Sequence, residues 1–254
     1  MTFPTLFVGQ PYLHLPICPS TNSHLAELVQ QNPTLYEGTV VITDMQTAGR
    51  GQKGNVWEAE PYQNLTFSLL LKPIFLPIQK QFFLNMCVAL GIYDFLQAVA
   101  PEHSWAIKWS NDILHQEKKQ KIAGILIENT IRKQTIEHSI VGIGLNINQQ
   151  HFEVQKATSL RNITQKSYIL ADLLPILFQH IEKNYLLLKA EKYEKIKENY
   201  LKSLYLYQQT AYYYDKKQDI YFEGIIQDVA ESGKIIVQVG QSFVPFDLKE
   251  IVFL

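Results

Sequence analysis

KIAGILIENTIRKQTIEHSIVGIGLNI, residues 121–147, holds two apolar, β-branched runs separated by the short polar stretch TIRKQ. The runs at Ile122–Glu128 and Ile136–Ile147 predict strands, and the short connection predicts that they pair as an antiparallel hairpin. A parallel pair would need a crossover of about a dozen residues or more. The stretch therefore favours an α+β fold over a doubly wound parallel sheet.

The residues before Tyr207 predict further strands and a few grouped helices. Along residues 64–72 apolar positions alternate with Thr66 and Ser68, which is the two-residue period of a strand. Ser20 precedes apolar positions at helical spacing, which is typical of a helix start. The predicted strands lie at 39–44, 64–72 and 105–109, and the predicted helices at 20–32, 79–99 and 167–205, the last in two segments.

The pattern changes after Tyr207. Short aromatic and β-branched runs follow one another (TAYYYD, DIYFEGII, KIIVQV and SFVPF), broken by DVAESG and VGQS. This spacing predicts a small antiparallel barrel of about 50 residues. We therefore expect two domains, at residues 1–206 and 207–254.

Composition places the chain among ordinary globular proteins. Of its 254 residues 46% are hydrophobic and 19% charged, and the formal net charge is −1. No overall positive field would hold it on nucleic acid or on an anionic membrane. The apolar run at 82–96 is shorter than the roughly 20 residues of a membrane-spanning helix. Cys18 and Cys87 have no CxxC partner, which favours a reducing cytoplasm and a soluble protein.

The loop TAGRGQKGNVW, Thr47–Trp57, is the first chemical feature. Three glycines and two cations fall within residues 49–54, so the main chain can approach a ligand closely and Arg50 can meet a phosphate or carboxylate. Neither a P-loop nor a dinucleotide-binding fingerprint fits the spacing. Taken alone, the loop is more typical of a solvated surface turn with Trp57 packed in the core.

Two further segments carry polar residues on predicted strands. AIKWSNDIL presents Lys108, Asn111 and Asp112 after an apolar strand, although Ser-Asn-Asp by itself is most often a turn. In KIAGILIEN, Lys121 lies where a charged turn becomes a buried strand, and Gly124 inside that strand indicates a close approach by a ligand or another backbone. A solvated lysine at a strand end is the alternative for Lys121.

IVGIGLNIN, residues 140–148, places small residues on one face of a strand. Gly142 and Gly144 alternate, and Asn146 follows on the same face. Such a face could form the floor of a pocket or could admit a packed helix.

Four segments together, in this order, resemble the catalytic domain of biotin–protein ligases. They are STN, TAGRGQKGNVW, KWSND with KIAGILIE, and GIGLNIN, and the resemblance covers nearly the whole chain. Its most specific parts are GRGxxGxxW and KWxND…KxAGIL. Related lipoate ligases and octanoyl transferases share the fold but lack the loop that leads from GRG to Trp. The resemblance implies a class II aminoacyl-tRNA-synthetase-like catalytic domain with a mixed, largely antiparallel sheet, followed by a small SH3-like β-barrel.

The resemblance also implies a role for each matching residue. Lys121 and Arg50 would be catalytic. Biotin binding is implied for Ser20, Thr21, Asn22, Gln46, Arg50, Gly51, Gln52, Lys121 and Gly124, binding of ATP or the adenylate for Lys53, Trp57, Lys108, Asn111 and Asn146, and Mg²⁺ binding for Asp112.

The implied activity is ATP-dependent formation of biotinyl-5′-AMP, followed by transfer of biotin to one lysine of a biotin carboxyl carrier domain. Many family members carry a basic residue at the position of Gln52, so we expect weaker retention of the adenylate here. Because STN begins at Ser20, we expect no DNA-binding domain in front of it and no binding to DNA. A homodimer is compatible with the resemblance. The rival interpretations are transfer of lipoate or octanoate and a non-enzymatic adaptor.

Overall fold

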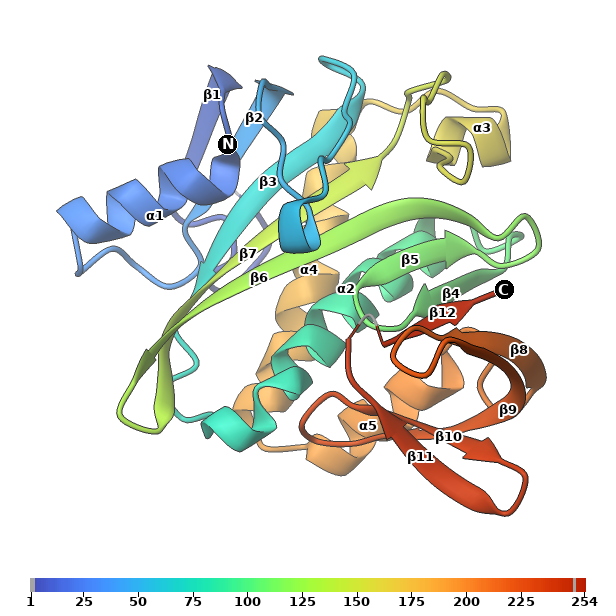
Figure 1. Ribbon diagram of the computed structural model, residues 1–254. Helices are drawn as coiled ribbons and strands as arrows, with labels where there is room; N and C mark the ends of the chain where they lie inside the picture. The colour runs from blue at the N-terminus through green and yellow to red at the C-terminus, as the bar shows by residue number, and fades with distance from the viewer. Residues whose placement is uncertain (1–2, 249) are drawn as a thin grey trace.

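The larger part of the fold is built on one seven-stranded sheet with the strand order β1-β2-β3-β7-β6-β5-β4 (Figure 1). The computed structural model describes residues 3–248 and 250–254, and of Lys53 only the main chain. Strands β1 and β2 are parallel and the other neighbours are antiparallel, so the predicted mixed, largely antiparallel sheet is confirmed. The strands are β1 Tyr12–Cys18, β2 Val40–Gln46, β3 Asn64–Leu71, β4 Trp105–Lys108, β5 Asp112–His115, β6 Gln120–Arg132 and β7 Thr135–Asn146.

Strands β6 and β7 form the predicted antiparallel hairpin, which is longer than expected. Pairing continues to Arg132↔Thr135, so most of the polar stretch is strand and only the last residues turn. Lys133 adopts a positive φ of 57° in this turn. The apolar residues of these strands end before the hydrogen-bonded pairing does, so the sequence pattern predicts strands that are too short at the hairpin end.

The helices lie on the two faces of the sheet (Figure 1). Helix α1, Thr21–Gln31, contacts β2, β3 and β7, and its start is capped by Ser20. Helix α2 packs against α4 and α5 behind the sheet, where the predicted two-segment helix is found. The other helical segments are η1 Gln52–Gly54, η2 Ile78–Lys80, α2 Phe82–Val99, α3 Leu160–Thr164, α4 Leu170–Lys189 and α5 Tyr193–Lys202.

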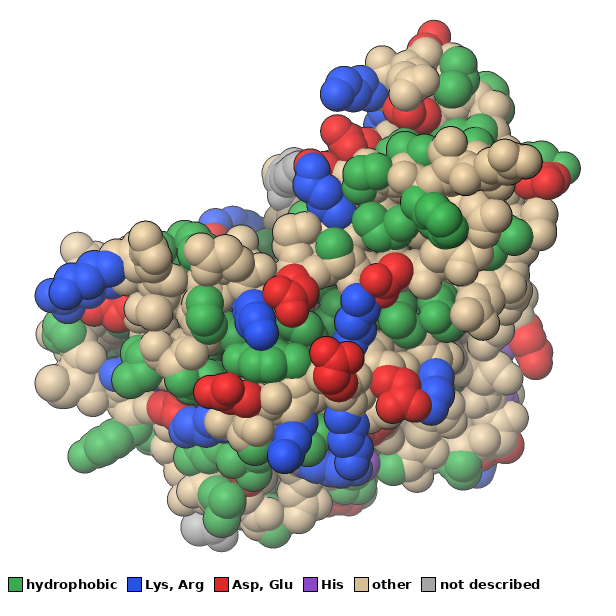
Figure 2. All heavy atoms as spheres, turned by 90° about the horizontal axis from the view of Figure 1, so that it is seen from below, with side chains coloured by type: hydrophobic (Ala, Val, Ile, Leu, Met, Phe, Trp, Pro, Cys, Tyr) green, Lys and Arg blue, Asp and Glu red, His purple; other side chains and the backbone are tan. Residues whose placement is uncertain are grey.

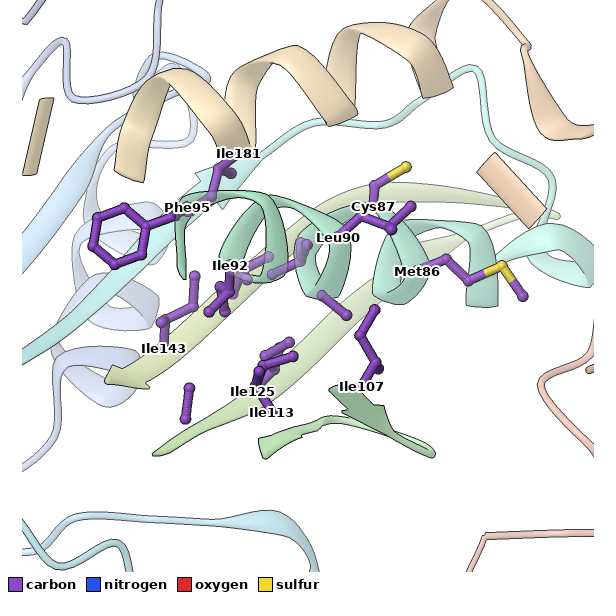
Figure 3. Packing of buried hydrophobic residues seen from close by; sticks show 14 of the residues in the cluster. Met86, Cys87, Leu90, Ile92, Phe95, Ile107, Ile113, Ile125, Ile143 and Ile181 are labelled. Carbon is purple, nitrogen blue, oxygen red and sulfur yellow. The ribbon is translucent and has the colours of Figure 1, made fainter. Parts of the chain in front are cut away.

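Helix α2 is the centre of the core. Figure 3 shows Ile92 of α2 on the side of the helix that faces the strands carrying Ile113 and Ile125, while Ile181 of α4 lies on the opposite side. A Cβ on Gly91 would lie 2.8 Å from the Cα of Ile181, so the glycine permits this close helix contact.

By length and composition the segment Ile78–Val99, 22 residues, could cross a membrane. The prediction from the run at 82–96 that this segment is too short to span a membrane is therefore wrong, because the helical segment is longer than that run. Within this segment, 67% of the most apolar 18-residue stretch is buried inside the protein, which is typical of a core helix.

Some elements were not predicted. Strand β1 contains Pro16, which lowers strand propensity but is tolerated at a sheet edge. Strand β5 begins at Asp112, so the expected turn of Ser-Asn-Asp is confined to Ser110 and Asn111. Helix α3 and the last strand, β12, are too short to give a periodic signal.

A separate five-stranded antiparallel sheet follows, with the order β11-β10-β9-β8-β12. It packs against the β4 edge of the large sheet, where the indole Nε1 of Trp109 donates to the carbonyl oxygen of Gly233 at 2.9 Å. Figure 2 shows acidic and basic side chains interspersed on the face seen from below. The strands are β8 Thr210–Asp215, β9 Ile220–Val229, β10 Ile235–Val239, β11 Ser242–Phe246 and β12 Ile251–Phe253.

Candidate active site

Three glycines of β6 and β7, Gly124, Gly142 and Gly144, form the floor of the candidate site, on the sheet face opposite α2. Gly124 and Gly144 are register partners on β6 and β7. The indole of Trp57 lies on both, because a Cβ on Gly144 would be 2.2 Å from its Cε2 and one on Gly124 would be 3.0 Å from its Cζ3. A Cβ on Gly142 would be 2.3 Å from Oδ1 of Asn22. The sequence indicates a close approach to Gly124 by a ligand or another backbone, whereas the groups that approach it in the structure are the side chains of Trp57 and Lys121.

The glycine-rich loop folds back over this floor as a small hairpin. The amide of Gly51 donates to the carbonyl of Asn55 at 2.7 Å, and the amide of Trp57 donates to the carbonyl of Gly49 at 3.0 Å. Gly54 turns the chain with φ 85°. The indole Nε1 of Trp57 is buried and has no hydrogen-bond partner within the described part of the chain. The loop thus holds an unsatisfied donor over the sheet.

A polar wall closes one end of the floor. The main-chain N–H of Thr21 donates to Oε1 of Gln46 at 2.9 Å, which ties the start of α1 to the end of β2. Ser68 of β3 contacts Oγ1 of Thr21 at 2.7 Å and Oδ1 of Asn22 at 2.5 Å. The hydroxyls and amides of this wall fix one another's orientation.

Arg50 faces a carboxylate. Its Nη2 lies 3.0 Å from Oε2 of Glu128, and the same oxygen accepts a hydrogen bond from Nδ2 of Asn22 at 2.7 Å. The sequence interpretation missed Glu128, because the strand pattern of β6 gives no sign of its partner. Arg50 therefore bridges the glycine-rich loop to β6 in this structure.

Lys121 lies on the opposite side of the floor. Its Nζ is 2.7 Å from Oδ1 of Asp112 and 5.3 Å from the centroid of the Trp57 ring. Two main-chain hydrogen bonds hold the position, from the Lys121 amide to the carbonyl of Lys156 and from the Thr158 amide to the carbonyl of Lys121. The Lys121 side chain is 34% exposed and its ammonium is ion-paired, which disfavours the alternative of a freely solvated strand-end lysine.

A second lysine next to Asp112, Lys108, is half-buried. Burial lowers the pKa of Lys108, and the nearby cations Lys156 and Lys121 lower it further while Asp112 opposes the change. The Lys108 ammonium also lies 5.4 Å from the ring centroid of Phe253 in β12. Lys121 and Lys108 thus flank one carboxylate, and Lys156, which had not been predicted, is a further cation that acts on Lys108.

The side-chain amides of the two predicted asparagines, Asn111 and Asn146, differ in their hydrogen bonding. Nδ2 of Asn111 donates to the carbonyl of Ile125 at 2.7 Å, so this amide ties the β4–β5 turn to β6. Asn146 is buried and donates from Nδ2 to the carbonyl of Thr158 at 3.0 Å. Its Oδ1 is buried without a partner within the described residues, and Asn146 lines the larger of the two cavities described below.

Two adjoining cavities contain these groups. The smaller, of about 50 Å³, lies between α1, the glycine-rich loop, β3, β6 and β7. The larger, of about 600 Å³, extends between the loop, the β4–β5 turn and the small sheet. Five residues line both: Gly51, Gln52, Trp57, Asn111 and Lys121.

The predicted residues come together at these cavities. Lys53 is the exception, since its side chain lies outside the described part of the structure. Besides the five shared residues, the predicted residues that line the smaller cavity are Ser20, Thr21, Asn22, Gln46, Arg50 and Gly124. Those that line the larger cavity are Lys108, Asp112 and Asn146. Lys216, in the turn after β8, and Phe253 of β12 also line the larger cavity, and no local motif in the sequence indicates them. Among the described residues no three His, Cys, Asp or Glu side chains form a metal-binding group.

Comparisons with known proteins identify related sequences and a related fold. The chain is 36% identical over 146 residues to the bifunctional ligase/repressor BirA of Bacillus spizizenii, covering 58% of this chain and 43% of that protein. It is 31% identical over 161 residues to the biotin–[acetyl-CoA-carboxylase] ligase of Mycobacterium tuberculosis, covering 61% of this chain and 58% of that protein. The matches thus span about half the length of these relatives.

The fold is that of a solved biotin protein ligase from Aquifex aeolicus in complex with biotin and ATP, with a TM-score of 0.77, 23% identity, and coverage of 94% of this chain and 97% of that chain. A model of the biotin/lipoate A/B protein ligase family matches residues 15–146. Because this match covers more than half of the 254 residues, the chain belongs to the biotin/lipoate A/B protein ligase family.

Proposed function

We propose that the chain activates biotin with ATP to form biotinyl-5′-AMP and then transfers biotin to a lysine of a carrier domain. The observation that carries the proposal is the position of Lys121 at the junction of a small polar-walled cavity and a larger cleft. Two substrates that react with one another need such a shared boundary. The names of the relatives, which include biotin ligases, agree with this reaction.

In the first step a carboxylate oxygen of biotin attacks the α-phosphorus of ATP, and pyrophosphate leaves with the electrons of the broken P–O bond. The step brings two anions together, so a fixed cation between them lowers the barrier. The Lys121 ammonium has three N–H donors and can hold Asp112 while also contacting the carboxylate and the phosphate. We assign it the catalytic role.

The smaller cavity is the proposed biotin site. The polar wall of Thr21, Asn22 and Gln46 would contact the ureido ring, and Ser20 its surroundings. Gly51, Gln52 and Gly124 would then lie along the path toward the reacting carboxylate. Arg50 would contact the ligand from the edge of this cavity, because its guanidinium is held there by the ion pair with Glu128.

The larger cavity is the proposed ATP site. Trp57 and Asn146 each present a buried polar atom without a partner, one donor and one acceptor, which the edge of a purine or a ribose hydroxyl would satisfy. Lys108 would meet the phosphates, since an anion would offset the cost of its buried charge. Lys53 and Asn111 are proposed for the adenylate on family resemblance.

Asp112 is the proposed protein ligand of Mg²⁺. It offers one carboxylate at the edge of the larger cavity, and Mg²⁺ is generally held by one or two carboxylates together with substrate phosphates. The ion would therefore enter with ATP, and it would neutralise charge on the phosphates. Titration with Mg²⁺ in the presence and absence of ATP tests this order of binding.

In the second step the neutral amine of the acceptor lysine attacks the carbonyl carbon of biotinyl-5′-AMP, AMP leaves, and the amine loses a proton. We propose a biotin carboxyl carrier domain as the partner. We further propose that residues 207–254 are an SH3-like domain that closes the ATP side of the site through Lys216 and Phe253. A cytoplasmic location, no binding to DNA and a homodimer remain predictions.

Biotin-dependent exchange of labelled pyrophosphate into ATP tests the proposal. Exchange that requires biotin, and that lipoate does not support, is the expected result. Stabilisation of the protein against heat by biotin but not by lipoate would agree, because a ligand bound to the folded state raises its stability. Exchange supported by lipoate or octanoate alone would overturn the choice of biotin within this family.

A further inference from the structure

A chain of hydrogen bonds leads from Glu128 at the rim to the polar wall of the smaller cavity. Oε2 of Glu128 lies 2.7 Å from Nδ2 of Asn22, Oδ1 of Asn22 lies 2.5 Å from Oγ of Ser68, and Oγ of Ser68 lies 2.7 Å from Oγ1 of Thr21. Ser68 is fully buried, so no solvent molecule competes for its hydrogen. We call this chain the Glu128 relay.

The carboxylate of Glu128 at one end determines the direction of every hydrogen bond along the relay. A carboxylate only accepts, so the Asn22 atom next to Glu128 must be the NH₂ group, which leaves the carbonyl oxygen facing Ser68. Asn22 also directs this NH₂ at the carbonyl of Leu126, at 3.4 Å. Ser68 has a single hydroxyl hydrogen and must donate it to Asn22.

Thr21 is the end of the relay that lines the cavity. Because the Ser68 hydrogen is used, the 2.7 Å contact is a hydrogen bond only if Thr21 donates to Ser68. Oγ1 of Thr21 also lies 3.3 Å from Oε1 of Gln46, a longer contact than the 2.7 Å to Ser68. With its hydrogen directed at Ser68, Oγ1 of Thr21 presents an acceptor to a ligand. Gln46 is fixed independently, because its Oε1 accepts the Thr21 amide and its Nε2 remains as a donor.

An acceptor beside a donor matches the N–H and C=O of a cyclic urea. We propose that Glu128 is a positioning residue that sets the acceptor character of Thr21 through Asn22 and Ser68, and so adapts the cavity to the ureido N–H of biotin. The inference rests on the proposed biotin activation. Glu128 touches no ligand in this scheme. Its other connection to the cavity is the ion pair with Arg50, which lines the same cavity, and the test below separates that ion pair from the relay.

The test compares two substitutions in the pyrophosphate exchange assay. Glu128→Met removes the acceptor at similar length, so Asn22 can turn and Thr21 loses its fixed polarity. We expect the KM for biotin to rise about tenfold, with little change in kcat. Glu128→Gln keeps a carbonyl oxygen that can accept from both Asn22 and Arg50, and we expect its KM to stay within about twofold of the wild-type value.

Two further measurements separate the relay from a general structural effect. Ser68→Ala interrupts the relay without touching the ion pair of Arg50, and Glu128→Met should add little to it in the double variant. Biotin methylated on one ureido nitrogen lacks an N–H donor, so Glu128→Met should discriminate against it less than the wild type does. Glu137→Gln, in the ion pair with Arg132 on the same hairpin, is the matched control.

The outcomes distinguish the two proposals. Absence of any biotin-dependent exchange in the wild-type protein refutes the proposed function. Wild-type exchange together with unchanged biotin KM values in Glu128→Met and Ser68→Ala refutes the relay. Equal losses in Glu128→Met and Glu128→Gln would also refute it, because the negative charge and not the acceptor would then be the cause. Should Glu128→Met not fold, Ser68→Ala and the methylated analogue decide the question.

Discussion

Gly144→Ala tests whether Trp57 covers the site. The added Cβ would lie 2.2 Å from Cε2, 2.4 Å from Cζ2 and 2.5 Å from Nε1 of the indole. Non-bonded carbon atoms normally lie about 3.5 Å apart or more, so the rigid ring must move away by at least about 1 Å. Overpacking of this kind costs about 1–3 kcal/mol when the neighbour cannot move.

The neighbour can move in this case. Trp57 belongs to a hairpin loop whose Val56 is 82% exposed, so the loop can lift from the sheet. We therefore expect the free energy of unfolding to fall by less than about 1 kcal/mol. The KM for ATP should rise by about tenfold or more, because the indole no longer lies over Gly124 and Gly144.

The assay is quenching of tryptophan fluorescence by acrylamide. Trp105 and Trp109 are 3% and 7% exposed, so Trp57→Phe isolates the contribution of Trp57. Gly124→Ala is the matched control, since its Cβ would meet the flexible end of Lys121 and the ring edge at 3.0 Å, and its effects should be smaller. Unchanged quenching and an unchanged KM for ATP in Gly144→Ala would refute this account of the floor.

Three other substitutions are informative. Gln52→Arg adds a cation at the boundary of the two cavities, and we expect slower release of biotinyl-5′-AMP in a filter-retention assay. Glu182→Ala removes a carboxylate that accepts from the amides of Leu6, Phe7 and Val8 at 2.7, 2.8 and 3.0 Å, and should lower the free energy of unfolding by about 2–4 kcal/mol in urea. Lys108→Met should raise the Tm of the ligand-free protein at pH 7, because the folded-state pKa of Lys108 is lowered and its charge is unfavourable there. The unfolded chain binds the proton more tightly, so the penalty decreases as the pH rises from the folded pKa toward 10.5, and the gain in Tm should shrink at pH 10.

Each of these has an outcome that contradicts it. An adenylate released as fast from Gln52→Arg as from the wild type would show that charge at this position does not retain it. For Glu182 the control is Glu198→Ala, an exposed partner of Lys202, and equal losses would deny a special role to the buried carboxylate. A lower Tm of Lys108→Met at pH 7 would show that packing of its aliphatic chain outweighs the charge.

The sequence determined what depends on neighbours along the chain. The apolar runs on either side of TIRKQ fixed an antiparallel hairpin, because side-chain alternation and a short connection are local properties. The spacing of Gly142 and Gly144 likewise put small residues on one face of β7 before any partner was known. Resemblance in four ordered segments then pointed to the residues that line both cavities.

The tertiary structure decided what depends on pairing across distance. Arg50 and Glu128 are 78 residues apart, and only the folded loop directs one at the other. Lys216 and Phe253 reach the larger cavity because the small sheet packs on the β4 edge. The apolar helix α2 belongs to the core because α4 and the sheet cover it. Periodicity shows which face of an element is apolar, but it does not show which element covers that face. The Glu128 relay likewise joins residues of α1, β3 and β6, so it forms only when these elements pack together.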